Sequence, residues 1–320
     1  MVKLLAARGA NLDRKLDEDG LTVLHWACHN GHASMVDVLA KAGADLSVQG
    51  SKGTALHYAA FAKSREVAES LLNNGANPST SGPGGLTALH ISVFDPAEGL
   101  LKLLLRAGAH VNAKTEHGGA SALHIALSFE PTNTKIIRLL LDHGADVNIR
   151  GDYPKGETPL HIAAHSGKIS AAALLVSRGA DVRAKCANGE TALHRAASSD
   201  EAEMPQWLLD HGAQIDARGD GGDTALSLAS VYGNSRAAEV LLHHGVTDLE
   251  LARSMMCRWC GAHKRDECSH DPRSIYKRTG FQRDNTIAYG SGAEQTCRCV
   301  AVVLLGGGRH VEESQRADCA

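Results

Sequence analysis

Large aromatic side chains are scarce in this sequence. Of its 320 residues, 4% are Phe, Trp or Tyr, whereas 33 are glycine. Aromatic rings normally dominate the packing of a single globular core. Their scarcity favours thin layers filled by Leu, Val and Ala. The net charge of −3 and the hydrophobic content of 43% suit a soluble protein with a sizeable core.

Long apolar segments and targeting signals are also lacking. The longest uninterrupted apolar run, Cys299–Leu305, is far shorter than the roughly 20 residues that a membrane helix needs. The residues after Met1 are too few and too polar for a signal peptide. No glycosylation sequon remains once Asn-Pro-Ser is excluded. We therefore expect no membrane insertion and a cytoplasmic location, with the nucleus as the alternative.

Cysteine and charge are unevenly distributed along the chain. Only Cys28 and Cys186 precede residue 251, whereas six cysteines lie in the last 64 positions. Residues 251–320 contain 11 Lys and Arg against 8 Asp and Glu, which leaves 22 against 28 in the first 250 residues. Neither part has the basic face or stripe that nucleic-acid binding requires. Two regions of different composition therefore meet near residue 250, and we expect no nucleic-acid partner.

Two short phrases recur in step along the first 250 residues. A Leu-His pair recurs every 32 to 37 residues, and a Gly-Ala pair follows each copy. The spacing from His to Gly is 18 residues in six of seven copies, with 20 between His124 and Gly144, whereas the spacing from Gly to the next His varies from 14 to 17. The repeated pairs are Leu24-His25, Leu56-His57, Leu89-His90, Leu123-His124, Leu160-His161, Leu193-His194 and the variant Leu226-Ser227. A segment of fixed length therefore alternates with a loop of variable length.

Each fixed segment is predicted to contain two helices. Thr158-Pro159 suits a helix start, because Thr caps free backbone N–H groups and Pro fits the first turn. Gly179 suits the left-handed conformation that ends a second helix containing Leu174-Leu175. One helix pair cannot bury its own apolar side, so the pairs must stack.

The stretch from Gly156 to Gly167, Gly-Glu-Thr-Pro-Leu-His-Ile-Ala-Ala-His-Ser-Gly, followed by Arg178-Gly179-Ala180-Asp181-Val182, resembles an ankyrin repeat almost position by position. The resemblance covers residues 1–252, as a leading half repeat and seven whole repeats. It implies an all-α repeat solenoid, an ankyrin-type stack of helix pairs with projecting finger loops. Residues 253–320 are expected to form a separate Cys-rich tail that is disordered or irregular.

The repeat histidines are expected to be structural. They recur one per layer, whereas a catalytic site requires a nucleophile, a base and an orienting group to converge. The resemblance implies that each His bonds to the nearby Thr and to neighbouring backbone. We therefore expect no catalytic residues, no cofactor, no small-molecule substrate and no enzyme activity.

The resemblance also implies a surface for partners. In ankyrin stacks the positions after the Leu-His pair, on the first helix and the following turn, line the concave face where partners dock. Five of the twelve aromatic residues fall there, and aromatics are enriched in interface hot spots. Packing between adjacent helices is the alternative explanation, and the net negative charge of the repeats favours a partner carrying Lys or Arg. The candidate partner-binding residues are Trp26, His29, Asn30, Tyr58, Phe61, Phe94, Asp95, Phe129, His165 and Arg195.

The tail contains one metal-like pattern. Cys257-x-x-Cys260 is a plausible half of a tetrahedral zinc site, to which Cys268 and His270 would add ligands. The further spacing matches no zinc module, so disorder, or translation of unspliced or shifted sequence, is the favoured interpretation, and no metal site is predicted.

The sequence thus predicts a non-catalytic protein–protein interaction scaffold or adaptor that binds a protein partner on its concave face and fingers. Two alternatives stay open. In the first, the chain is a fragment of a larger multidomain enzyme or signalling protein, in which the repeats are the targeting or regulatory module. Alternatively, it is a zinc-dependent adaptor that acts through the Cys-rich tail. Fold alone does not establish function, and the identity of the partner is not encoded in any motif.

Overall fold

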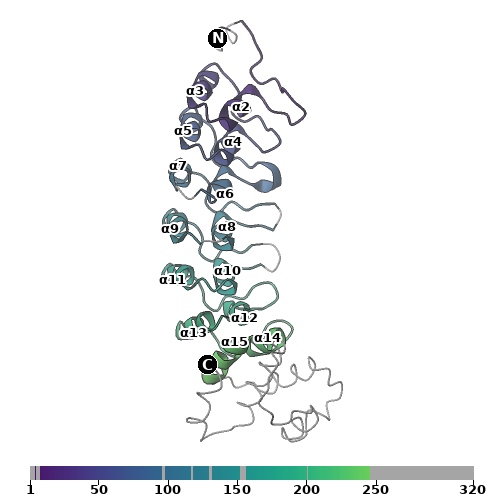
Figure 1. Ribbon diagram of the computed structural model, residues 1–320, viewed down its shortest axis with the longest axis vertical. Helices are drawn as coiled ribbons and strands as arrows, with labels where there is room; N and C mark the ends of the chain where they lie inside the picture. The colour runs from purple at the N-terminus through teal and green to yellow at the C-terminus, as the bar shows by residue number, and fades with distance from the viewer. Residues whose placement is uncertain are drawn as a thin grey trace, which may run out of the picture. The chain divides into compact units, whose positions relative to one another are not determined.

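The computed structural model describes residues 4, 8–95, 98–116, 118–129, 132–151, 156–199 and 201–245. Within them the chain forms pairs of antiparallel helices joined by loops, which confirms the predicted all-α repeat stack (Figure 1). The first helices of the pairs are α2 (Val23–His29), α4 (Ala55–Phe61), α6 (Ala88–Ser92), α8 (Ala122–Ser128), α10 (Pro159–His165), α12 (Ala192–Ala197) and α14 (Ala225–Tyr232). The second helices are α3 (Ala33–Lys41), α5 (Arg65–Asn73), α7 (Gly99–Arg106), α9 (Thr134–Asp142), α11 (Ile169–Ser177), α13 (Glu203–Asp210) and α15 (Ser235–His243). A 3-10 turn, η1 (Pro83–Gly85), lies in the loop before α6.

The chain divides into two compact units. Unit 1 comprises residues 1–159 and 173–180, and unit 2 comprises residues 160–172 and 181–320. In unit 1 the first helices α2, α4, α6 and α8 pack in one row, and the second helices α3, α5, α7 and α9 pack in another (Figure 1). In unit 2, α12 packs on α14, and α13 packs on α15. Each unit is therefore built of successive layers, as expected for a repeat protein.

The ends of the helices are where the sequence places them. The helix α10 begins at Pro159, directly after Thr158, as the Thr-Pro phrase predicts. Each second helix is followed by a glycine in the left-handed region, for example Gly179 with φ of +91° after α11. A residue with a Cβ atom is disfavoured in that conformation, which explains why glycine recurs there.

The apolar core is a series of leucine layers. Leu140 in α9 and Leu175 in α11 are completely buried, and so are Leu71 in α5 and Leu104 in α7. The leucine of each Leu-His pair is also buried. The predicted layers of Leu and Ala are confirmed.

Several expectations fall outside the described residues. Of the first seven residues only Leu4 is described, so the leading half repeat stays a prediction. The boundary at residue 252 and the tail with Cys257, Cys260, Cys268 and His270 also lie outside them. Among the helices that the structure describes, none is long and apolar enough to cross a membrane.

Candidate protein-interaction surface

Each repeat histidine joins its own helix to the next loop. The backbone N–H of Thr54 donates to Nδ1 of His57 over 3.1 Å, and the Thr54 hydroxyl lies 2.9 Å from the same nitrogen. Because Nδ1 accepts, the ring proton sits on Nε2, which donates to the carbonyl of Leu86 over 2.9 Å. The equivalent bonds run from His25 to Val48, from His90 to Ala113, from His124 to Glu157, from His161 to Glu190 and from His194 to Asp223.

Four of these histidines are neutral structural groups. Burial lowers the pKa of His25, His57, His90 and His194 below the usual histidine value, because a buried charge loses its hydration. The hydrogen-bond pattern that the family resemblance implies is thus confirmed. Within the described residues, no three His, Cys, Asp or Glu side chains gather closely enough to hold a metal ion.

The last repeat departs from this pattern. Ser227 stands where the other repeats have His, and both of its hydroxyl bonds are to Thr224: it accepts from the backbone N–H over 2.9 Å and donates to the carbonyl over 2.8 Å. The short side chain therefore preserves the helix start without the bridge to a following loop.

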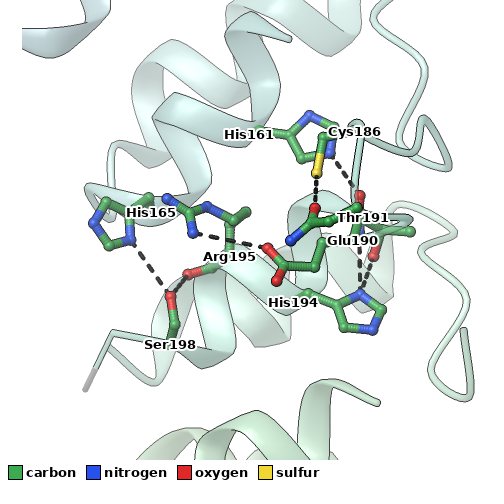
Figure 2. Close-up of polar contacts among 9 residues, drawn as sticks. His161, His165, Cys186, Glu190, Thr191, His194, Arg195 and Ser198 are labelled. Atoms are coloured by element: carbon green, nitrogen blue, oxygen red, sulfur yellow. Dashed lines mark hydrogen bonds and ion pairs between the residues drawn. The ribbon is translucent and has the colours of Figure 1, made fainter. Parts of the chain in front are cut away.

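In unit 2 the side chain of the candidate Arg195 is largely buried. Figure 2 shows its guanidinium beside the Glu190 carboxylate, with Nη1 and Oε2 3.8 Å apart and only 17% of the arginine side chain exposed. The carbonyl of Glu190 also accepts the bond from His161. Exposed His165 lies 3.5 Å from the Ser198 hydroxyl, which donates to the Arg195 carbonyl. The Arg195 side chain is thus engaged within its own repeat.

Four aromatic rings of unit 1 are half exposed. The described residues include eight exposed large apolar side chains, and four of these belong to the predicted set. Trp26 is 46% exposed, Phe61 and Phe94 are 45% and Phe129 is 50%. The rings of Phe94 and Phe129 meet edge to face, with centroids 4.5 Å apart. We call Trp26, Phe61, Phe94 and Phe129 the aromatic row.

The prediction of a surface position is wrong for two residues. Tyr58 is only 3% exposed. Its ring packs edge to face on His25 of the preceding repeat, and its hydroxyl accepts from the backbone N–H of Lys52 over 3.1 Å. Asp95 is only 7% exposed. Both side chains are therefore part of the packing and are not presented to a partner.

The aromatic row occupies three different positions relative to the repeat histidine. Phe61 and Phe94 stand four residues after the repeat histidine, and Phe129 stands five after it. Trp26 stands directly after His25, at the position that Tyr58 occupies in the next repeat. The same position is thus exposed in one repeat and buried in another, because the Tyr58 hydroxyl reaches into its own finger loop.

The remaining candidates of the first repeat lie at the end of α2. His29 and Asn30 are exposed. The Asn30 side-chain amide donates to the Trp26 carbonyl over 2.8 Å and so satisfies one of the last carbonyls of the helix. Asn30 thus has a local structural role beside Trp26.

Two residues that sequence reasoning did not single out follow the phenylalanines. Lys63 and Glu98 have φ of +51° and +57°, and they are the non-glycine residues with positive φ in the part of the chain that the structure describes. Lys63 stands where other repeats have Gly31, Gly167 and Gly233. Aligning the repeats on their histidines would have revealed this exchange of glycine for lysine.

The chain belongs to the ankyrin-repeat family. The family model for ankyrin repeats matches residues 1–82, 89–186, 150–219 and 179–251, and the domain built of such repeats is itself non-catalytic.

Among known proteins, the chain is 38% identical over 223 residues to the nuclear factor NF-kappa-B p105 subunit of Mus musculus, which covers 56% of this chain and 23% of that protein. It is 28% identical over 228 residues to the E3 ubiquitin-protein ligase KEG of Arabidopsis thaliana, covering 56% and 14%. The crystal structure of the ankyrin repeat domain of Bcl-3, a member of the IkappaB protein family, superposes with a TM-score of 0.62 at 29% identity, over 70% of this chain and 100% of that one. The match thus spans less than a quarter of either curated relative.

Proposed function

We propose that this protein is a non-catalytic interaction scaffold or adaptor and that the aromatic row anchors its protein partner. The observation that carries the proposal is the contrast within unit 1. Four large rings are half exposed on or directly after successive first helices, whereas the leucines of those helices are buried. Exposed aromatic clusters of this kind mark interaction sites more often than isolated exposed leucines do.

The geometry of the rings suits binding. Phe94 and Phe129 hold each other edge to face, so less side-chain freedom is lost when a partner covers them. The partner would remove both rings from water and gain the free energy of apolar burial. The relationship to p105 and Bcl-3 supports the proposal, since ankyrin regions are typically protein-binding modules.

The test is partner capture with matched variants. We expect the double variant Phe61→Ala, Phe94→Ala to weaken capture by about 1 kcal/mol or more for each ring, as is typical of hot-spot truncation. Tyr232→Ala is the matched control, because this ring is 62% exposed but lies in unit 2. Quantitative mass spectrometry should show the same proteins on wild type and control, and their loss from the double variant. Equal capture by all three proteins would contradict the proposal.

A second proposal concerns the context of the repeats. The matched region makes up only 23% of p105 and 14% of KEG, so these repeats are modules of longer polypeptides in the relatives. We propose as the alternative that the repeats target or regulate a larger enzyme or signalling protein. An antibody against unit 1 distinguishes the two on a cell extract: a band near 33.7 kDa favours the adaptor, and a much larger band favours the module. Fractionation of the same extract tests the proposed location in the cytoplasm or nucleus.

A further inference from the structure

We propose that the amino-terminal end of unit 1 docks one amphipathic helix of a protein partner, and that this helix has a small residue where the repeats of this chain have histidine. The site lies before α2, which is the first helix of its row in the described residues (Figure 1). It is carried by three exposed apolar side chains, at positions where no later repeat has an exposed residue. The inference goes beyond the proposed function and does not depend on it.

Two of these side chains lie on the helices of the first whole repeat. Trp26 on α2 is 46% exposed, and Met35 on α3 is 40% exposed. The position of Trp26 is not exposed in any of the six later repeats, and the position of Met35 is buried in all six. In the next repeat the two positions hold Tyr58 and Val67, and the Tyr58 ring packs on His25 of the repeat before it. Trp26 and Met35 therefore stand where a preceding layer makes contact, and an outer layer without that neighbour exposes them.

The third side chain belongs to the finger loop that leads into α2. Leu16 is 57% exposed, and its backbone N–H donates to the Leu21 carbonyl over 2.7 Å. The equivalent bond, from Gly82 to the Leu86 carbonyl, closes a later finger over the same distance. Leu16 and Gly82 both stand seven residues after the glycine of a Gly-Ala pair. At this position the other fingers also have small residues, which are Gly50, Thr115, Gly151, Cys186 and Gly219.

The small residues leave room for the histidine of the preceding repeat. A Cβ atom on Gly82 would stand 3.0 Å from Nε2 of His57, and one on Gly50 would stand 3.6 Å from Nε2 of His25. A leucine side chain extends well beyond Cβ, so Leu16 takes the volume that the histidine ring fills beside the later fingers. A helix seated before α2 would therefore be overpacked if it carried histidine at its contact position, whereas alanine or serine leaves room for the leucine.

The contacts within unit 1 define the kind of partner. First helices pack side by side, α2 on α4 and α4 on α6, and the place before α2 continues this row. The occupant is thus a helix with an apolar face toward Trp26 and Met35. A second copy turned to face this end would bring the same large side chains against each other, where the site requires a small one. Exposed Arg14 and Asp17 flank Leu16 with opposite charges, so shape, and not net charge, selects the partner.

The chain itself supplies a probe of the required chemistry. The helix α14 has Ser227 in place of the repeat histidine. One synthetic peptide copies residues 221–234, and its matched control is the same peptide with Ser227→His. Both are acetylated and amidated, because terminal charges oppose the dipole of a short helix. We expect the full chain to bind the serine peptide about tenfold or more tightly than the histidine peptide, since the larger ring is overpacked against Leu16. Fluorescence anisotropy of labelled peptides measures both affinities.

An exchange of volume tests the contact itself. Leu16→Gly gives the first finger the residue that stands at Gly82, and it should reverse the preference, so that the histidine peptide binds more tightly. Trp26→Ala should weaken the serine peptide by about tenfold or more, as removal of a central anchor does. The double variant Phe61→Ala, Phe94→Ala is the matched control, because it also removes half-exposed rings of unit 1. It should leave both affinities unchanged.

The outcomes that overturn the inference are distinct. Equal affinity of the wild-type chain for the two peptides, or a preference that Leu16→Gly leaves unchanged, would contradict the small-residue contact. A dimer in sedimentation equilibrium that Trp26→Ala dissociates would assign the site to a second copy. A cross-link from photo-methionine at Met35 to residues 246–320 of the same chain would assign it to the tail. Each of these failures leaves the proposed function intact, since that proposal is tested through Phe61 and Phe94.

Discussion

The first helices of the repeats begin alike and end differently. Each begins with Thr or Ser followed two residues later by Leu, and six of the seven then have the same histidine bridge. Their ends vary. The helix α2 is followed by exposed Asn30, α4 by Ala62 and the strained Lys63, and α8 by Phe129 in an extended conformation. The uniform beginnings build the stack, and the variable ends are where this chain differs from repeat to repeat.

The helix α4 shows the difference between a contact with the preceding repeat in the middle of a first helix and a variable end. Tyr58 and Phe61 lie one turn apart on α4, yet Tyr58 is buried by contacts to His25 and to its own finger while Phe61 is 45% exposed. Contacts to the preceding repeat therefore fix the middle of the helix, whereas its end is open to substitution. Mutations near the beginning should act on stability, and mutations at the end should act on binding.

For the uniform beginnings of the first helices, the largest loss of stability is expected when the pH is lowered. Burial lowers the pKa of His25, His57, His90 and His194 in the folded state, so the unfolded chain binds protons first as the pH falls below about 6.5. Stability is therefore highest above that pH and is lost below it, by at most about 1.4 kcal/mol per pH unit for each histidine. Urea unfolding at pH 7.5, 6.5 and 5.5 measures the free energy of unfolding at each pH. We expect His194→Gln to make this free energy change less steeply with pH. A free energy of unfolding that stays constant to pH 5.5 would contradict the neutral assignment.

The second prediction concerns the buried leucine layers, which support both the beginnings and the ends of the first helices. Leu140 is completely buried in α9, so Leu140→Ala leaves a cavity and should cost about 2–5 kcal/mol. Leu175 in α11 is equally buried and should behave alike. Chemical denaturation provides the measurement, and a loss below about 0.5 kcal/mol at both sites would mean that the leucines do not form the core.

The third prediction separates the helix cap from the bridge. His57→Ser gives the second repeat the residue that the last repeat has at Ser227, which keeps the local bonds to Thr and loses the 2.9 Å bond to the Leu86 carbonyl. The Leu86 carbonyl keeps the 2.7 Å bond from the backbone N–H of Gly82, so the variant loses one hydrogen bond, about 0.5–1.5 kcal/mol. The total cost should be larger because a buried ring is removed as well. The comparison variant is Ser227→Ala, which loses only the local cap, at about 0.5–2 kcal/mol. If His57→Ser lowers the free energy of unfolding no more than Ser227→Ala does, the histidine bridge contributes little to stability.

The sequence was sufficient to predict the stack because the repeat fixes spacing. Thr158-Pro159, Gly179 and the Leu-His pairs each depend on contacts within one helix pair or to its neighbour, and such contacts recur with the period. The burial of Tyr58 was not predictable from this pattern, because it depends on whether the Tyr58 hydroxyl reaches Ser51 and Lys52 in the finger. Lys63 was missed for a related reason, since its significance lies in a backbone angle.

The smallest effect on stability is expected at the variable ends. Phe61 is 45% exposed and contacts the Lys52 ammonium at 5.7 Å, so Phe61→Ala should change the free energy of unfolding by about 0.5 kcal/mol or less, as exposed positions usually do. Tyr58→Ala, one turn earlier on the same helix, removes a buried ring and its hydroxyl bonds and should cost several-fold more, about 3–5 kcal/mol. Urea denaturation of both variants at pH 7.5 gives the ratio directly. If Phe61→Ala destabilises the protein as much as Tyr58→Ala does, the ring is inter-repeat packing, and the difference between the beginnings and the ends of the first helices disappears with it.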